Sequence, residues 1–186
     1  MYLFENIYAL PCMPYVSQFF EHFFHVWGSL HFYRNELRNF AKLTKNCKDK
    51  SKQNAVVMGR NTWESIPAQH RPLKDRLNVV LPYTSDIFLL YGVLVCPRLK
   101  DALTLLEENY QNKIENVWII GGARVYEDAL NLSNCHKLHV THIQEKPECD
   151  VFFPTIPRDF QIITHLIFCS IFYIIFLKHE IILTHT

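Results

Sequence analysis

The sequence predicts an α/β fold with a central, mostly parallel sheet. The middle of the chain contains short apolar runs of strand length, among them Ala55–Met58, Leu77–Leu81 and Val117–Ile120. Each run ends at a glycine or a proline, and segments with helical spacing lie between the runs. Strands that alternate with helices favour parallel pairing, because the helical crossovers cover the faces of the sheet.

The periodic segments around these runs complete the alternation. Apolar residues recur at helical spacing in Arg34–Lys45, in Leu99–Leu106 and after Gly121–Gly122. Lys137–Ile143 instead alternates apolar and polar residues, which is typical of a half-buried strand. We therefore expect at least four strands and three helices in the middle of the chain.

Length and composition restrict the class of protein. A chain of 186 residues with 49% hydrophobic residues has enough apolar material for a domain with its own core, which excludes a disordered tail. A formal charge of +1 lacks the strongly basic balance of nucleic-acid-binding proteins, so we expect no nucleic-acid partner.

The cysteines indicate a reducing compartment. The six cysteines are all at least fourteen residues apart, so no CxxC motif for zinc or redox chemistry exists. The chain also opens without the basic region of a secretion signal. We therefore expect reduced thiols, no bound metal and a cytoplasmic protein; disulfides are the alternative that an even number of cysteines leaves open.

Both ends of the chain differ in composition from its middle. Residues 1–33 and 161–186 contain 4 of the 37 charged residues but 9 of the 14 phenylalanines and 6 of the 10 histidines. Residues 34–160 contain 18 basic and 15 acidic residues, as an ordinary globular domain does. We therefore divide the chain into a domain over 34–160 and two atypical flanking segments.

The C-terminal segment contains an apolar run, Ile162–Leu177, that carries no formal charge. Its 16 residues are fewer than the eighteen or so that make a membrane span plausible. Because isoleucine, phenylalanine and tyrosine dominate the run, we expect buried β structure. A membrane anchor is the alternative reading.

Two glycine-containing segments have the pattern of phosphate sites. Gly59–Thr62 and Gly121–Arg124 each leave a strand and open a helix. Unpaired N–H groups at a helix start attract anions, and glycine lets a ligand approach the backbone closely. Two such ends on neighbouring strands would divide a dinucleotide between them, whereas a tight turn without a ligand is the alternative for each. Neither segment matches the Rossmann fingerprint or a P-loop.

A single carboxylate adjoins the apolar stripe of the first predicted helix. Leu37, Phe40 and Leu43 form this stripe at three-residue spacing, and Glu36 lies one position before it. If the stripe faces a cavity, Glu36 is the charged group at its edge. A solvated glutamate in the first turn of a helix is the alternative.

Six segments, in this order, together resemble one protein family. They are RNELRNF from Arg34, MGRNTWESIP from Met58, RPLKDRLNVVL from Arg71, VWIIGGARVYEDAL from Val117, VTHI from Val140 and DVFFP from Asp150. Residues 34–160 resemble dihydrofolate reductase, with the animal-type enzymes the most similar. The resemblance implies a three-layer dihydrofolate reductase-like fold around a mostly parallel sheet. It also implies a monomeric oxidoreductase of one-carbon metabolism that transfers hydride from NADPH to 7,8-dihydrofolate and forms 5,6,7,8-tetrahydrofolate.

The resemblance assigns roles at the substrate site. Glu36 occupies the position of the acidic residue that hydrogen-bonds the pterin, and Thr141 the position of the threonine that supports this carboxylate. Arg76 occupies the position that binds the α-carboxylate of the glutamate tail, a task suited to a guanidinium. The other residues expected at the substrate site are Leu37, Phe40, Ile66, His70 and Ile120.

The resemblance also places an NADPH site at the two glycine-containing segments. After Leu81 the family usually has serine or threonine near the adenosine 2′-phosphate, whereas here Pro82 and Tyr83 follow. We still expect NADPH rather than NADH, because Arg60 is available to neutralise that phosphate. The residues expected to contact the cofactor are Arg60, Asn61, Thr62, Leu81, Gly121, Gly122, Ala123, Arg124, Val125 and Tyr126.

Both flanking segments depart from the family. Residues 1–33 contain neither a recognisable opening strand nor the glycine-containing loop that closes over the nicotinamide. Residues 161–186 do not resemble the remainder of the family's final hairpin. We therefore expect a missing or replaced central strand and lid. A working enzyme, an inactive protein that at most binds NADPH or folate, a mis-assembled gene product and a membrane-tethered form all stay open.

Replacement of the expected catalytic carboxylate tests this assignment. Because a carboxylate in an apolar pocket can bias protonation of the substrate, Glu36→Gln is expected to slow the chemical step more than it weakens cofactor binding. Turnover and cofactor affinity of the wild-type chain and of Glu36→Gln, measured in parallel at neutral pH, test this expectation. Full turnover by Glu36→Gln would remove Glu36 from the mechanism.

Overall fold

The computed structural model describes residues 7–9, 31–82, 92–133, 135–143, 153–168 and 171–178. Side chains are described for 37–82, 92–133, 135–140 and 153–163. The helices are α2 (His31–Lys45), α3 (Arg60–Ser65), α4 (Leu99–Tyr110) and α5 (Ala123–Leu130), with a 3₁₀ turn at Ala68–His70. The strands are β1 (Ile7–Ala9), β2 (Gln53–Gly59), β3 (Arg76–Leu81), β4 (Val93–Val95), β5 (Ile114–Ile119), β6 (Cys135–Ile143), β7 (Phe160–Phe168) and β8 (Ile171–Lys178).

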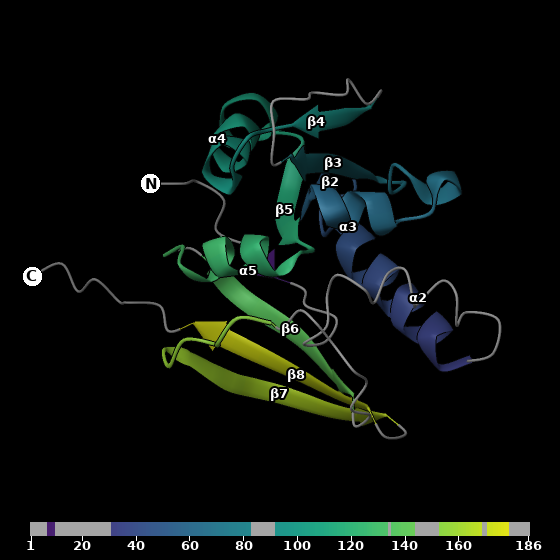
Figure 1. Cartoon of the computed structure of the whole chain (residues 1–186), viewed down its shortest axis with the longest axis vertical. Coiled ribbons are helices and arrows are strands. Elements are labelled where there is room, and N and C mark those ends of the chain that lie inside the picture. The colour runs from purple at the N-terminus through teal and green to yellow at the C-terminus, as the bar shows by residue number, and fades with distance from the viewer. Residues whose placement is uncertain are drawn as a thin grey trace, which may run out of the picture.

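Within these residues the strands form one eight-stranded sheet in the order β4-β3-β2-β5-β1-β6-β8-β7. The first six strands of that order pair in parallel, and only β8 and β7 are antiparallel to their neighbours. The hairpin of β7 and β8 lies at one end of the sheet and β4 at the other (Figure 1). The mostly parallel sheet predicted from the sequence is confirmed.

The central strands are buried on both faces, which explains their continuous apolar sequence. Successive side chains of a strand point to opposite faces, so alternate residues of β2 and β5 enter two different cores. One core packs against α4 and α5 and includes Val57, Ile119 and Leu103. The other packs against α2 and α3 and includes Met58 and Trp118. Helices on both faces of the sheet give the expected three-layer architecture.

The N-terminal segment supplies a strand in the middle of this sheet. Ile7–Ala9 pairs in parallel with β5 on one side and with β6 on the other. The sequence analysis expects a missing or replaced central strand, and β1 occupies that place: its three residues pair with both neighbouring strands without any resemblance to the family's sequence. Helix α2 also begins at His31, before the border that composition placed at residue 34. The lid position falls in 10–30, outside the described residues.

The C-terminal segment forms the hairpin that the sequence did not reveal. Strand β8 pairs with β6 from Lys137↔Leu177 to Ile143↔Ile171, and β7 pairs with β8. The described residues of the apolar run, 162–168 and 171–177, are thus β structure, as predicted. It is not buried throughout, since Ile162 and Ile163 on the edge strand are 58% and 46% exposed. Among the described residues, no helix is both long enough and apolar enough to cross a membrane.

A buried amide joins the end of α2 to the sheet. The side chain of Asn54 on β2 donates to the carbonyl oxygens of Thr44 and Asn46, both at 3.0 Å. Its Oδ1 accepts from the Cys47 thiol at 3.2 Å and from both the backbone and side-chain nitrogens of Asn116 on β5. Because Asn54 is fully buried, these bonds have no solvent competitor and fix where α2 ends.

The three cysteines whose side chains are described are buried free thiols, as the sequence analysis expects. They are Cys47, Cys96 and Cys135. Burial raises the pKa of the Cys47 and Cys96 thiols, which keeps both protonated at neutral pH. Cys12, Cys149 and Cys169 lie outside the residues whose side chains are described.

A histidine lies on the α2 side of the sheet. The His139 ring on β6 packs against Trp118 on β5, with 5.3 Å between ring centroids. Burial, with a smaller contribution from Lys137, lowers the pKa of His139 from 6.5 to about 4. The imidazole is therefore neutral in the folded protein at neutral pH.

This histidine makes stability depend on pH. Because the unfolded chain protonates His139 near pH 6.5 and the folded chain only near pH 4, the unfolded state binds more protons in that window and stability falls as pH falls through it. We expect a loss of up to about 3 kcal/mol that His139→Phe abolishes. Urea unfolding of both proteins across this window measures the difference. Parallel pH profiles for the two proteins would contradict the assignment.

Candidate functional site

A pocket of about 520 Å³ opens between α2 and the segment that leads into β3. The face of α2 toward it is set by helical spacing, since Leu37, Phe40 and Ala41 fall on one side of the helix. The sequence analysis predicts six substrate-site residues besides Glu36 and Thr141. Five of these six line the pocket: Leu37, Phe40, Ile66, His70 and Arg76. The remaining lining residues are Arg38, Ala41, Lys45, Leu73 and Lys74.

Arg76 is the buried cation of this pocket. It is 9% exposed, and burial lowers the pKa of its guanidinium to about 10, so the group stays charged at neutral pH. Its Nη1 donates to Thr44 Oγ1 at 2.7 Å and its Nε to the Lys74 carbonyl at 3.0 Å. The guanidinium carbon lies 5.8 Å from the centre of the Phe40 ring. A cation fixed against an aromatic wall suits a ligand with an aromatic body and a carboxylate.

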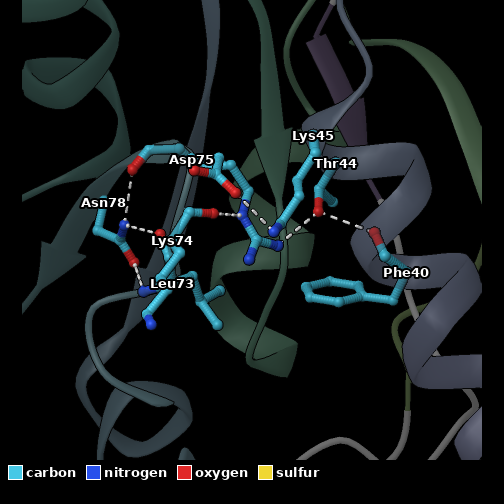
Figure 2. A network of polar contacts seen from close by, with 8 residues as sticks. Phe40, Thr44, Lys45, Leu73, Lys74, Asp75 and Asn78 are labelled. Atoms are coloured by element: carbon cyan, nitrogen blue, oxygen red, sulfur yellow. Dashed lines mark hydrogen bonds and ion pairs between the residues drawn. The ribbon is translucent and has the colours of Figure 1, made fainter.

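The segment before β3 is shaped by another buried amide. The Oδ1 of Asn78 accepts from the backbone nitrogen of Leu73 at 2.9 Å, and its Nδ2 donates to the carbonyl oxygens of Leu73 and Arg76 (Figure 2). Asp75 adopts a left-handed backbone conformation, with φ at 61°. Its carboxylate pairs with Lys45 at the end of α2, at 2.7 Å (Figure 2). These contacts close the rim of the pocket around Arg76.

The pocket carries an excess of positive charge. Arg38, Lys45, Lys74 and Arg76 line it, together with His70. Among the lining residues whose side chains are described, none is an aspartate or a glutamate, and Asp75 beside the pocket pairs with Lys45. An anionic group on the ligand is therefore favoured at this end of the pocket.

Ile120 lies between the core behind this pocket and the glycine pair Gly121–Gly122, which follows β5. It is 3% exposed and packs in the core that contains Ile66 and, at its edge, Phe40. Gly121 follows it directly, and the backbone nitrogen of Ile120 donates to the Val57 carbonyl of β2. The pocket therefore adjoins the carboxyl ends of β2 and β5.

Two helix starts meet at these strand ends. Gly59 precedes α3 and Gly122 precedes α5, and the Gly59 nitrogen donates to the Gly121 carbonyl at 2.7 Å. A Cβ added to Gly122 would lie 3.6 Å from Thr62 Oγ1, so the two helix starts approach each other closely. The predicted cofactor residues Asn61, Thr62, Ala123 and Arg124 lie in the first turns of these helices.

The other predicted cofactor residues differ in their exposure. Arg60 is at the surface and its Nε pairs with Glu64 at 2.7 Å. Leu81, Val125 and Tyr126 are instead buried in the core on the α4 and α5 side. The Val125 side chain still adjoins the start of α3, since its Cγ2 would lie 3.4 Å from a Cβ added to Gly59. A cofactor contact through these three side chains stays a prediction.

For the predicted catalytic pair, Glu36 and Thr141, the structure describes only the backbone. Glu36 lies in α2 one turn before Phe40, and Thr141 lies in β6 two residues after His139. The side chains of Glu36 and Thr141 are outside those that the structure describes. Their roles at the pterin stay predictions.

The structure adds residues that the sequence analysis missed. Thr44 is fully buried and bonds Arg76, although threonine in the last turn of a helix gives no signal of its own. Ala41 falls four residues after Leu37, Thr44 four after Phe40 and Lys45 four after Ala41, so extending the helical face of Leu37 would have found their positions. Lys74 and Leu73 carry no such periodicity, because they belong to an irregular segment.

The fold and the two adjoining sites define an α/β protein with an apolar, cationic pocket next to paired helix starts. The family model described as "Dihydrofolate reductase" matches residues 35–167, and the chain belongs to the dihydrofolate reductase family. The dihydrofolate reductase of Drosophila melanogaster is 50% identical over 129 residues, which are 69% of this chain and 70% of that protein. The one from Aedes albopictus is 42% identical over 138 residues, 70% of this chain and 71% of that protein.

A solved structure extends the likeness to both ends of the chain. It is similar to Schistosoma mansoni dihydrofolate reductase with a TM-score of 0.73 and 25% sequence identity. The superposition covers 94% of this chain and 98% of that one. The superposition thus extends beyond residues 34–160, the part of the chain in which the sequence analysis found the resemblance.

Proposed function

We propose that this chain reduces 7,8-dihydrofolate to 5,6,7,8-tetrahydrofolate with NADPH as the hydride donor. The observation that carries the proposal is the position of Arg76 in a pocket lined by four other predicted substrate residues, Leu37, Phe40, Ile66 and His70. Dihydrofolate has the matching chemistry, since it joins a flat pterin and an aromatic linker to a dicarboxylate tail.

The residues of the pocket divide the work of binding. Phe40 and Ile66 offer apolar walls to the aromatic part of the substrate. Arg76 offers paired N–H donors to a tail carboxylate, and its burial strengthens that contact. Glu36, one turn earlier on α2, is proposed to bind the pterin and bias protonation of its ring, with Thr141 supporting the carboxylate.

The helix starts fit the pyrophosphate of a nicotinamide dinucleotide. The first turns of α3 and α5 present backbone N–H groups side by side, and Gly122 leaves the space that a side chain would fill. Bound there, the cofactor supplies the hydride for the reduction. Because exposed ion pairs contribute little, Arg60 can exchange Glu64 for the 2′-phosphate that distinguishes NADPH from NADH.

The structure removes two of the reasons for considering this chain an inactive member of the family. These reasons were a missing central strand and a missing final hairpin, and β1, β7 and β8 supply both. The buried free thiols of Cys47, Cys96 and Cys135 fit a reducing compartment. We therefore propose an active enzyme of one-carbon metabolism that acts as a monomer in the cytoplasm.

An absorbance assay of the full chain tests the activity. We expect NADPH oxidation that depends on dihydrofolate and is blocked by methotrexate, an inhibitor that the family binds. Arg76→Gln is expected to raise the KM for dihydrofolate about 100-fold, because two charged hydrogen bonds to the tail are lost. Arg98→Gln is the matched control, since Arg98 pairs with Asp101 at the start of α4. Folate binding without turnover would favour the inactive alternative.

Cofactor preference tests the role of Arg60. The ratio of kcat/KM for NADPH to that for NADH is expected to fall about tenfold in Arg60→Gln, because the 2′-phosphate loses a charged partner. The NADH value is expected to stay unchanged, since NADH lacks this phosphate. An equal loss with both cofactors would assign Arg60 a structural role.

A further inference from the structure

The guanidinium of Arg76 is fixed by two hydrogen bonds on one side. Nε donates to the Lys74 carbonyl and Nη1 donates to the Thr44 hydroxyl, the shorter of the two at 2.7 Å. These are the hydrogen bonds that Arg76 makes among the described residues. A guanidinium has five N–H donors, so the remaining donors are available to a ligand, and the two fixed bonds set their direction.

The hydroxyl of Thr44 has a fixed orientation. It donates to the Phe40 carbonyl at 2.8 Å, as in the common bond from a helical threonine to the preceding turn (Figure 2). Its oxygen accepts the hydrogen bond from Arg76 Nη1. Thr44 is fully buried, so no water competes for this geometry. The hydroxyl therefore serves as donor to the helix and acceptor for the cation at once.

The position of Thr44 is in turn set by the sheet. Asn54 on β2 donates to the Thr44 carbonyl at 3.0 Å and accepts two hydrogen bonds from Asn116 on β5. All three residues are less than 10% exposed. A chain of buried polar contacts thus runs from β5 through β2 to the end of α2 and on to Arg76.

We infer that Thr44 is a positioning residue for substrate binding, whose hydroxyl orients the guanidinium of Arg76 to receive the carboxylate of the substrate's tail. The inference rests on the proposed function, since it names a second residue behind the same contact. Thr44 does not touch the substrate. It acts on the tail through Arg76, so replacing Thr44 is expected to leave the binding of the pterin end unchanged.

Ligands with and without the tail separate this role from a general effect on the fold. We compare 7,8-dihydrofolate with 7,8-dihydropteroate, which has the same ring system but no glutamate. Thr44→Val is expected to raise the KM for dihydrofolate about tenfold and to leave kcat and the KM for dihydropteroate within about twofold. Valine matches the shape of threonine, and the Phe40 carbonyl keeps the backbone bond of its helix.

The conservative variant and a matched control complete the experiment. Thr44→Ser retains the hydroxyl, so it is expected to keep the wild-type KM for dihydrofolate. Thr104→Val makes the same substitution on α4, away from the pocket, and is expected to change nothing. In an Arg76→Gln background, Thr44→Val is expected to add no further rise in KM, because the group that it orients is gone.

The outcomes distinguish this inference from the proposed function. If the wild-type chain reduces dihydrofolate but Thr44→Val leaves its KM unchanged, or raises the KM for both substrates equally, the inference alone is wrong. If Thr44→Val does not fold, Thr44→Ala and Thr44→Ser are compared with the same substrates and the same criteria. Affinities for folate and pteroate, from quenching of tryptophan fluorescence, replace KM if turnover is absent. A wild-type chain that binds neither ligand overturns both conclusions.

Discussion

The parallel pairing of β2 with β5 is the constraint on which the site depends. The two strands run side by side from Gln53↔Ile114 to Val57↔Ile119, and the Gly59 nitrogen closes the pair on the Gly121 carbonyl. This arrangement places the starts of α3 and α5 together at one edge of the sheet. It also places Ile120 in the core that contains Ile66 and against which Phe40 packs, and both of these residues line the pocket.

Buried polar side chains beside this sheet hold the segments around the pocket in fixed positions. Asn54 ties α2 to β2 and β5, and Asn78 shapes the segment that carries Arg76. An unpaired buried amide would cost free energy, so each of these side chains permits a single local arrangement of the backbone around it. The guanidinium of Arg76 is held in one orientation by its hydrogen bonds to Thr44 and to the Lys74 carbonyl.

The middle of the fold was predictable because its physical signals are local. Apolar runs of strand length and helical spacing identify β2, β3, β5, α4 and α5 within a few residues of their observed bounds. Gly59 and the pair Gly121–Gly122 mark the helix starts, and Gly121 has a positive φ of 112°, which favours glycine. Arg76 and Phe40 followed from resemblance. Helical spacing could have found the position of Thr44, but its role required the structure, since that role depends on a partner 32 residues away.

The flanking segments show where sequence reasoning ends. Strand β1 has three residues, and its place between β5 and β6 is set by their open edges rather than by a motif. For β7 and β8 the sequence predicts β structure and leaves a membrane anchor as the alternative, because an apolar run indicates burial but not which strands pair. The family's fold is thus retained at both ends by hydrogen-bonding geometry after the resemblance in sequence has disappeared.

A crystal structure of the full chain with folate and oxidised NADP bound together tests the single crevice most directly. The account predicts the pterin between α2 and Ile120, the tail carboxylate on Arg76 and the pyrophosphate at Gly121 and Gly122. Ligands on separate surfaces, or a crevice filled by residues of either flanking segment, would contradict it.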